Sequence, residues 1–155
     1  MKFAIVPPSR PEAAFPRRPE FRRVPAVPVA RKHMSRNLLS VAPHLPLTDV
    51  AQRMVAREVG AALVAEGDRL VGILTERDVL RAVAKGIGED TTVADWMTPD
   101  PETMTPDEST EHAAVLMIHG GFRHLPIMEG QEVVGMLSIR DLMRVVLEDS
   151  APRGA

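Results

Sequence analysis

The sequence predicts an α/β fold in which two tandem β-α-β-β-α repeats pack as one pseudo-twofold domain. Residues 34–85 align with residues 97–148 without a gap, and internal similarity of this length is typical of repeat architectures. Each copy is too short to bury a stable core alone, so we expect the two copies to pack against each other. The identical pairs include Met34 and Met97, Pro43 and Pro106, Met54 and Met117, Gly72 and Gly135, and Leu74 and Leu137.

Each copy has the same predicted order of elements, which its apolar pattern and its glycines define. Apolar residues at helical spacing predict the first helix of each copy. Two short apolar runs around Gly67 or Gly130 predict a β-hairpin, and a second helix follows it. A short extended segment precedes each first helix. The expected ranges are 39–41, 47–58, 61–65, 70–74 and 76–84 in the first copy, and 102–104, 111–119, 124–128, 133–137 and 139–148 in the second.

The composition is that of a globular protein and is compatible with a reducing compartment. Hydrophobic residues make up 45% and charged residues 26%, and there is no cysteine to form a disulfide, a thiolate metal site or a thiol nucleophile. No apolar run approaches the roughly 20 residues that span a bilayer, and the apolar run near the N-terminus is too short for a secretory signal. We therefore expect a soluble, cytoplasmic protein that does not enter a membrane.

Residues 1–33 are predicted to form a basic tail that is disordered or extended. Half of the 14 prolines lie in it, together with the pairs Arg17-Arg18 and Arg22-Arg23, and prolines disfavour helix. Such a segment cannot bury enough apolar surface to offset its ordering entropy. Three interpretations stay open for it: a solvated tail, a misassigned start, or a segment that contacts nucleic acid or an acidic partner.

The most informative local pattern is a strand-to-helix turn that occurs in both copies. It reads Gly-Ile-Leu-Thr-Glu-Arg-Asp at 72–78 and Gly-Met-Leu-Ser-Ile-Arg-Asp at 135–141. One interpretation is a capping box, in which Thr75 or Ser138 and the aspartate three residues later satisfy the ends of the helix backbone. The other is a binding site, in which the free amides and the hydroxyl hold a phosphate and the carboxylate accepts hydrogen bonds from the 2′- and 3′-hydroxyls of a ribose.

These patterns resemble the CBS domain family, named after cystathionine β-synthase. The resemblance rests on Val-Gly-Ile-Leu-Thr-Glu-Arg-Asp at 71–78, Val-Gly-Met-Leu-Ser-Ile-Arg-Asp at 134–141 and Gly-Phe-Arg-His-Leu-Pro-Ile at 121–127. It covers residues 34–148 and leaves the tail outside. It implies a CBS pair, also called a Bateman module, with CBS repeat 1 over residues 34–90 and CBS repeat 2 over residues 91–150.

The resemblance also implies a ligand and the residues that bind it. Members of the family commonly bind adenosine derivatives, such as AMP, ADP, ATP or S-adenosylmethionine, in the two clefts between the repeats. The residues implied are Asp78 and Asp141 for the ribose, Thr75 and Ser138 as accompanying hydroxyls, Arg123 and His124 for the phosphates, and Val41, Ala42, Ile73, Met104, Thr105 and Met136 for the two adenine slots.

The sequence departs from the family pattern at the phosphate-binding positions of the first copy. Gly60 and Ala61 occupy the positions that match Arg123 and His124 in the second copy. We therefore expect unequal sites, in which the site of Asp141 is the better phosphate binder. The other site is expected to be weaker, to prefer a less charged ligand, or to use Arg123 from the second copy.

Strand geometry adds a condition to this expectation. If residues 123–127 are already extended, Arg123 and His124 point to opposite faces, because side chains alternate along a strand. Only one of the two would then reach a given cleft. The alternative for His124 is a satisfied polar residue at the interface of the repeats.

The resemblance favours a regulatory protein that binds an adenosine-type ligand and thereby changes its assembly, as a homodimer, or its contacts with a partner protein. No pattern predicts an enzyme, because the sequence has no nucleophile elbow, ordered triad, P-loop or dinucleotide motif. The histidines show no metal-ligand spacing, so we expect neither a metal nor a catalytic cofactor. The alternatives are a ligand-free structural or dimerisation module, in which both aspartates are only helix caps, and a nucleic-acid binder acting through the basic tail.

Overall fold

The computed structural model describes residues 27–150, so most of the predicted tail lies outside the described residues. The rest forms the expected mixed α/β fold with tandem repeats. The described elements are α1 (Ala30–His33), β1 (Ser40–Val41), α2 (Leu47–Ala56), β2 (Ala61–Glu66), β3 (Arg69–Thr75), α3 (Glu76–Lys85), β4 (Thr98–Pro99), α4 (Thr110–Gly120), β5 (His124–Glu129), β6 (Glu132–Ser138) and α5 (Ile139–Ser150).

The first repeat is built on a four-stranded sheet with the order β1-β2-β3-β4. The hairpin β2–β3 turns at Gly67, whose φ of 59° lies in the left-handed region that glycine adopts without steric cost. Strand β1 pairs parallel with β2, and β4 pairs antiparallel with β3. Helix α2 turns Leu47, Val50 and Met54 into the core, as its helical spacing predicts.

The second repeat reproduces this arrangement with shorter outer strands. The hairpin β5–β6 has the same antiparallel pairing and the same irregularity in register as β2–β3. The bridge between Met104 and Ile127 is parallel and stands where β1 meets β2, and the bridge between Ser35 and Met136 stands where β4 meets β3. The two halves are therefore related by the alignment that the sequence predicts.

The segment that leads into each repeat packs on the other repeat. Ala30 and Met34 belong to the apolar core of the second repeat, whereas Val93 and Met97 pack in the core of the first. Helix α1 lies in the first of these segments, and Arg31 there forms salt bridges of 3.1 Å to Asp107 and 2.9 Å to Glu129. Residues 27–33, which we expected to belong to the tail, thus pack on the second repeat.

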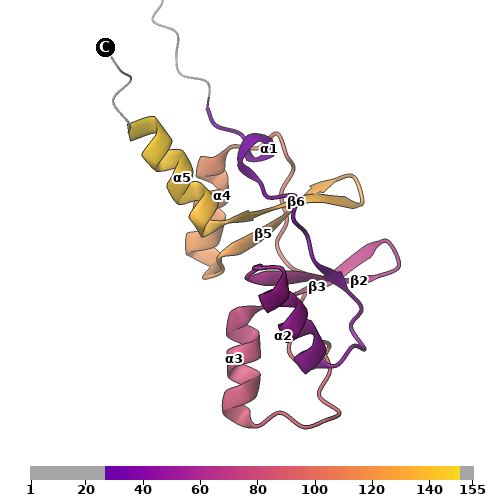
Figure 1. Cartoon of the computed structure of the whole chain (residues 1–155). Helices are drawn as coiled ribbons and strands as arrows, with labels where there is room; N and C mark the ends of the chain where they lie inside the picture. The colour runs from indigo at the N-terminus through magenta and orange to yellow at the C-terminus, as the bar shows by residue number, and fades with distance from the viewer. Residues whose placement is uncertain (1–26, 151–155) are drawn as a thin grey trace, which may run out of the picture.

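The two hairpins meet in the middle of the molecule, and the helices cover the outside. Figure 1 shows α2 and α3 on one side of the hairpins and α4 and α5 on the other. A small apolar cluster joins the repeats between the hairpins, with Leu63 and Ile73 from the first repeat and Met136 from the second. The ends of β3 and β6, where α3 and α5 begin, therefore lie at the boundary between the repeats.

Candidate functional site

Asp78 and Asp141 each cap the helix that follows the second hairpin strand. Thr75 donates two hydrogen bonds to Asp78 Oδ2, from its backbone nitrogen at 2.9 Å and from Oγ1 at 2.6 Å. Ser138 donates the same pair to Asp141 Oδ2, at 2.9 Å and 2.5 Å. The capping interpretation of this turn is therefore correct at the level of contacts, and it uses one oxygen of each carboxylate.

The second oxygen of each carboxylate is directed to an exposed arginine one turn along the helix. Asp78 Oδ1 lies 3.5 Å from Arg81 Nη1, and Asp141 Oδ1 lies 3.3 Å from Arg144 Nη1. These arginines are more than 60% exposed, at 63% and 66%, whereas the aspartates are mostly buried. Such a long, solvent-exposed contact contributes little, so this oxygen can accept hydrogen bonds from a ligand while the cap stays in place.

A pocket of about 660 Å³ opens beside Asp141, within the roughly 300–1,000 Å³ of typical small-molecule sites. We call it the Asp141 pocket. Its walls come from both repeats: the leading segment and α2 of the first repeat, and the end of β6 and the start of α5 of the second. The residues used below are Leu38, Gly60, Ala61, Arg123, His124, Met136, Ser138, Arg140 and Arg144.

A second pocket lies beside Asp78 and is much smaller, at about 230 Å³. We call it the Asp78 pocket. It contains Thr75, Arg77 and Arg81 from the first repeat, which are equivalent to Ser138, Arg140 and Arg144. Its opposite wall is the turn from Gly120 to His124, and the bulky Phe122 of this turn stands where the first repeat has Val59.

Arg123 and His124 line both pockets. Strand β5 begins only at His124, so Arg123 lies in the preceding turn and strand alternation does not force the two side chains apart. The condition on which we expected only one of them in a given cleft is therefore not met. Arg123 of the second repeat lines the pocket of Asp78, and its use by a ligand there, one of our three expectations for that site, stays a prediction.

The predicted adenine residues fall into two groups. Ile73 lines the Asp78 pocket and Met136 lines the Asp141 pocket. Val41 and Met104 are instead buried in the cores of the first and second repeat. Ala42 and Thr105, which follow them in the chain, are not among the residues that line either pocket.

The pocket walls that we assigned to these four residues are formed a few residues earlier in the chain. Ser35 and Leu38 line the Asp141 pocket, and their equivalents Thr98 and Pro101 line the Asp78 pocket. The cause is the crossing of the leading segments, because Ser35 pairs with Met136 and Thr98 pairs with Ile73. Sequence reasoning also missed the helix arginines, although Arg77 and Arg140 are identical between the copies, as are Arg81 and Arg144.

Comparison with known proteins identifies the family. A family model for the CBS domain matches residues 21–85 and 93–148, which is most of the chain and includes both pockets. The chain belongs to the CBS domain family. Its two CBS repeats therefore form a CBS pair, as the doubled turn predicts.

Relatives in three organisms carry this likeness. An uncharacterized 17.7 kDa protein of Acidianus ambivalens is 36% identical over 110 residues, which cover 70% of this chain and 66% of the relative. The CBS domain-containing protein YhcV of Bacillus subtilis is 34% identical over 70% of this chain and 79% of its own length. A CBS domain protein from Pyrobaculum aerophilum, solved in complex with AMP, is 28% identical with a TM-score of 0.71, covering 78% and 96% of the two chains.

Several curated relatives are longer than this CBS pair. The chain spans 44% of a relative from Methanocaldococcus jannaschii and 17% of a CBS domain-containing protein of Arabidopsis thaliana.

The imidazole of His124 is partly buried at the boundary of the CBS repeats. Burial lowers the pKa of its imidazole below the ordinary histidine value of 6.5, an effect that Glu76 and Asp141 oppose and Arg123 and Arg140 reinforce. The ring also packs against the first repeat, because a Cβ built on Gly60 would lie 3.1 Å from His124 Nε2. A ligand anion beside His124 would favour its charged form.

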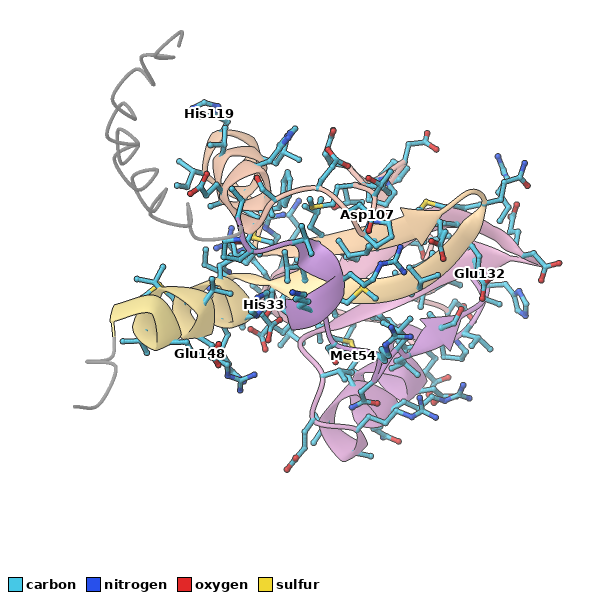
Figure 2. All side chains as sticks on the ribbon, turned by 90° about the horizontal axis from the view of Figure 1, so that it is seen from above. His33, Met54, Asp107, His119, Glu132 and Glu148 are labelled. Atoms are coloured by element: carbon cyan, nitrogen blue, oxygen red, sulfur yellow. The ribbon has the colours of Figure 1, made fainter. Side chains whose placement is uncertain are left out.

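Two further features of the described residues bear on function. His33 and His119 lie far apart in Figure 2, and the residues that the structure describes contain no group of three or more side chains suited to hold a metal ion. Within the same range, no helix combines the length and apolar character needed to cross a membrane.

Proposed function

We propose that this CBS pair is a regulatory module that binds an adenosine-containing ligand in the Asp141 pocket and does not catalyse a reaction. The observation that carries the proposal is the pocket itself: about 660 Å³ between the repeats, with a carboxylate, arginines and an apolar wall around it. The likeness to a CBS domain protein solved with AMP supports it. An alternative ligand-free module would not need such a hollow beside Asp141.

Each part of the ligand has a counterpart in the pocket. We assign Asp141 Oδ1 to the two ribose hydroxyls as their hydrogen-bond acceptor, because Oδ2 is held by the cap. Arg123 and Arg140 provide positive charge for phosphate oxygens. Leu38, Ala61 and Met136 offer apolar contact to an adenine ring; of these three, only Met136 was predicted for this role from the sequence.

Calorimetric titration with AMP, ADP, ATP and S-adenosylmethionine tests this assignment, using two matched variants. Asp141→Asn removes the charge but keeps the size of the side chain, and Asp78→Asn makes the same change to the cap of the other repeat. Hydrogen bonds to charged groups contribute about 1.5–3 kcal/mol, so Asp141→Asn is expected to weaken the tightest-binding ligand about 10- to 100-fold. Asp78→Asn is expected to leave that affinity within about threefold.

The two variants together separate ligand binding from folding. Both lose one charged helix cap, so a similar decrease in melting temperature is expected for each. The proposal fails if wild-type protein gives no heat and no thermal stabilisation with any of the four ligands. It also fails if the two substitutions weaken binding equally, since the affinity would then follow stability instead of the pocket. Salt-dependent binding of nucleic acid that is lost on deletion of residues 1–26 would favour the tail-based alternative.

We propose that the ligand acts on a homodimer formed through the outer helices. Exposed apolar side chains gather on all four of them: Val55 on α2, Leu80 and Val83 on α3, Val115 and Ile118 on α4, and Met143 and Leu147 on α5. Large exposed apolar patches mark interaction surfaces in soluble proteins. Light scattering is expected to give twice the chain mass, and a charged substitution, Leu80→Glu, to halve it. A monomeric wild-type protein would contradict the proposal.

A further inference from the structure

The ionisable side chains that the two pockets share have no ionisable equivalents in the other repeat. Glu76, Arg123 and His124 line both pockets. Their equivalents in the other repeat are Ile139, Gly60 and Ala61, which carry no charge. The repeats are thus pseudo-symmetric, but the first repeat has no charged counterpart of Arg123 and His124.

Because Gly60 has no side chain, His124 and Glu76 have room to line both pockets. A Cβ on Gly60 would lie 3.1 Å from His124 Nε2 and 3.7 Å from Glu76 Cδ. The imidazole and the carboxylate therefore both lie close to the bare backbone of Gly60. An arginine at this position, as in the second repeat, would occupy the space that the His124 ring fills.

The charge balance of both pockets depends on Arg123. Three arginines and three carboxylates line each pocket: Arg123, Arg140, Arg144, Glu58, Glu76 and Asp141 in one, and Arg77, Arg81, Arg123, Glu76, Asp78 and Glu102 in the other. Arg81 and Arg144 already face their own aspartates. Among the described residues Arg123 forms no salt bridge or side-chain hydrogen bond, so it is available to a ligand in either pocket.

We propose that the two pockets compete for Arg123, so that a phosphate-bearing ligand in one pocket weakens the binding of a second phosphate-bearing ligand in the other. This inference rests on the proposed function and adds a regulatory property to it. One guanidinium directed to a phosphate in the Asp141 pocket leaves the Asp78 pocket with more carboxylates than arginines, which disfavours an anion. A ligand without phosphate does not use Arg123, and the pockets then fill independently.

Titrations with AMP and with adenosine, its phosphate-free counterpart, test the competition in the full chain. The variants Asp141→Asn and Asp78→Asn report the affinity of each pocket when the other is disabled. In wild-type protein the second AMP is expected to bind about 10-fold more weakly than AMP binds to the Asp141→Asn variant, a coupling within the common range for linked sites. The second adenosine in wild-type protein and adenosine in the Asp141→Asn variant are expected to bind with affinities that agree within about twofold.

Two arginine variants show whether Arg123 is the cause. Arg123→Gln is expected to weaken AMP at both pockets and to reduce the coupling to that of adenosine. Arg140→Gln changes an arginine that lines the Asp141 pocket alone, so it is expected to weaken AMP there and to preserve the coupling factor for the second AMP.

The possible results are distinct. Two AMP molecules that bind without coupling, coupling that is equal for adenosine, or an Asp141→Asn variant that binds adenosine but not AMP would each overturn the competition and leave the proposed ligand class intact. A wild-type chain that binds neither AMP nor adenosine would overturn the proposed function as well.

Discussion

Equivalent positions in the two repeats are alike in the core and unlike at the boundary between them. Leu74 and Leu137 are both fully buried in their respective cores. Gly60 and Arg123 also correspond, yet one is a bare backbone position and the other is an exposed cation at the edge of both pockets. A core position constrains size and polarity, because close packing leaves no alternative. The boundary is free to differ, and there the difference produces two pockets of unequal volume and shared charge.

The leading segments show the same contrast between matching packing and differing chemistry. Ala30 packs in the second core and Val93 in the first, and both are fully buried. Only the first of these segments carries an arginine, Arg31, that forms salt bridges to the repeat on which it packs. Because each segment crosses to the other repeat, neither core is complete without residues from both halves of the sequence.

The comparison of the cores predicts the largest effects on stability. Leu74→Ala and Leu137→Ala each remove a fully buried side chain, and such truncations cost about 2–5 kcal/mol of unfolding free energy. We expect similar losses for the two variants and one cooperative transition in each, because the crossing segments join the cores. Urea denaturation followed by circular dichroism measures both quantities.

The single tryptophan gives this experiment an internal control. Trp96 packs against the core of the first repeat, so its fluorescence reports on that core, whereas circular dichroism reports on both. Coincident transitions by the two probes in the Leu137→Ala variant would confirm one unit. A circular dichroism transition at lower urea than the fluorescence transition would show that the second repeat unfolds alone and that the crossing does not couple the cores.

The elements of each repeat could be predicted from the sequence because their causes are local. Apolar spacing defines α2, the alignment of the two copies predicts α4, and the glycine turns define both hairpins, so the predicted helices and hairpin strands differ from the observed ones by only a few residues. The short strand β4 was not predicted, because its pairing with β3 is set by the crossing of the leading segment. Helix α1 was missed because its one fully buried residue is Ala30. Its burial depends on packing against a repeat that lies far along the chain, and prolines dominate the surrounding sequence.

The parts of the candidate site that depend on local patterns could be predicted from the sequence, and the parts that depend on packing between the repeats could not. The turns at Asp78 and Asp141 are local patterns, and the structure shows a cap and a pocket at each. The partner wall of each pocket comes from the crossing segment, so Leu38 and Pro101 could not be assigned from spacing within one repeat. The use of Arg123 by the Asp78 site was one of three alternatives from the sequence, and only the arrangement of both repeats in space shows that Arg123 lines both pockets.

A smaller effect on the free energy of unfolding is expected from pH, and it arises from a histidine that only the second repeat has at this position. His124 has a lowered pKa because it is buried, while its equivalent in the first repeat is Ala61. As pH falls, the unfolded chain takes up a proton near the ordinary value of 6.5, whereas the folded chain takes it up only at lower pH. Stability is therefore lost between these two values, and His124→Gln is expected to remove this part of the pH dependence.

Urea denaturation at several pH values between about 8 and about 5 measures the effect. The matched control is His119→Gln, which changes an exposed histidine near the C-terminal end of α4. Glu76 and Asp141 favour the charged imidazole, and Arg123 and Arg140 disfavour it. A phosphate that draws Arg123 toward itself and adds negative charge shifts this balance toward protonation. Saturating AMP is therefore expected to reduce the loss of stability at low pH in wild-type protein and to leave the His124→Gln variant unaffected. An equal response of both proteins would place the phosphate away from His124 and would remove the link between the boundary histidine and the ligand.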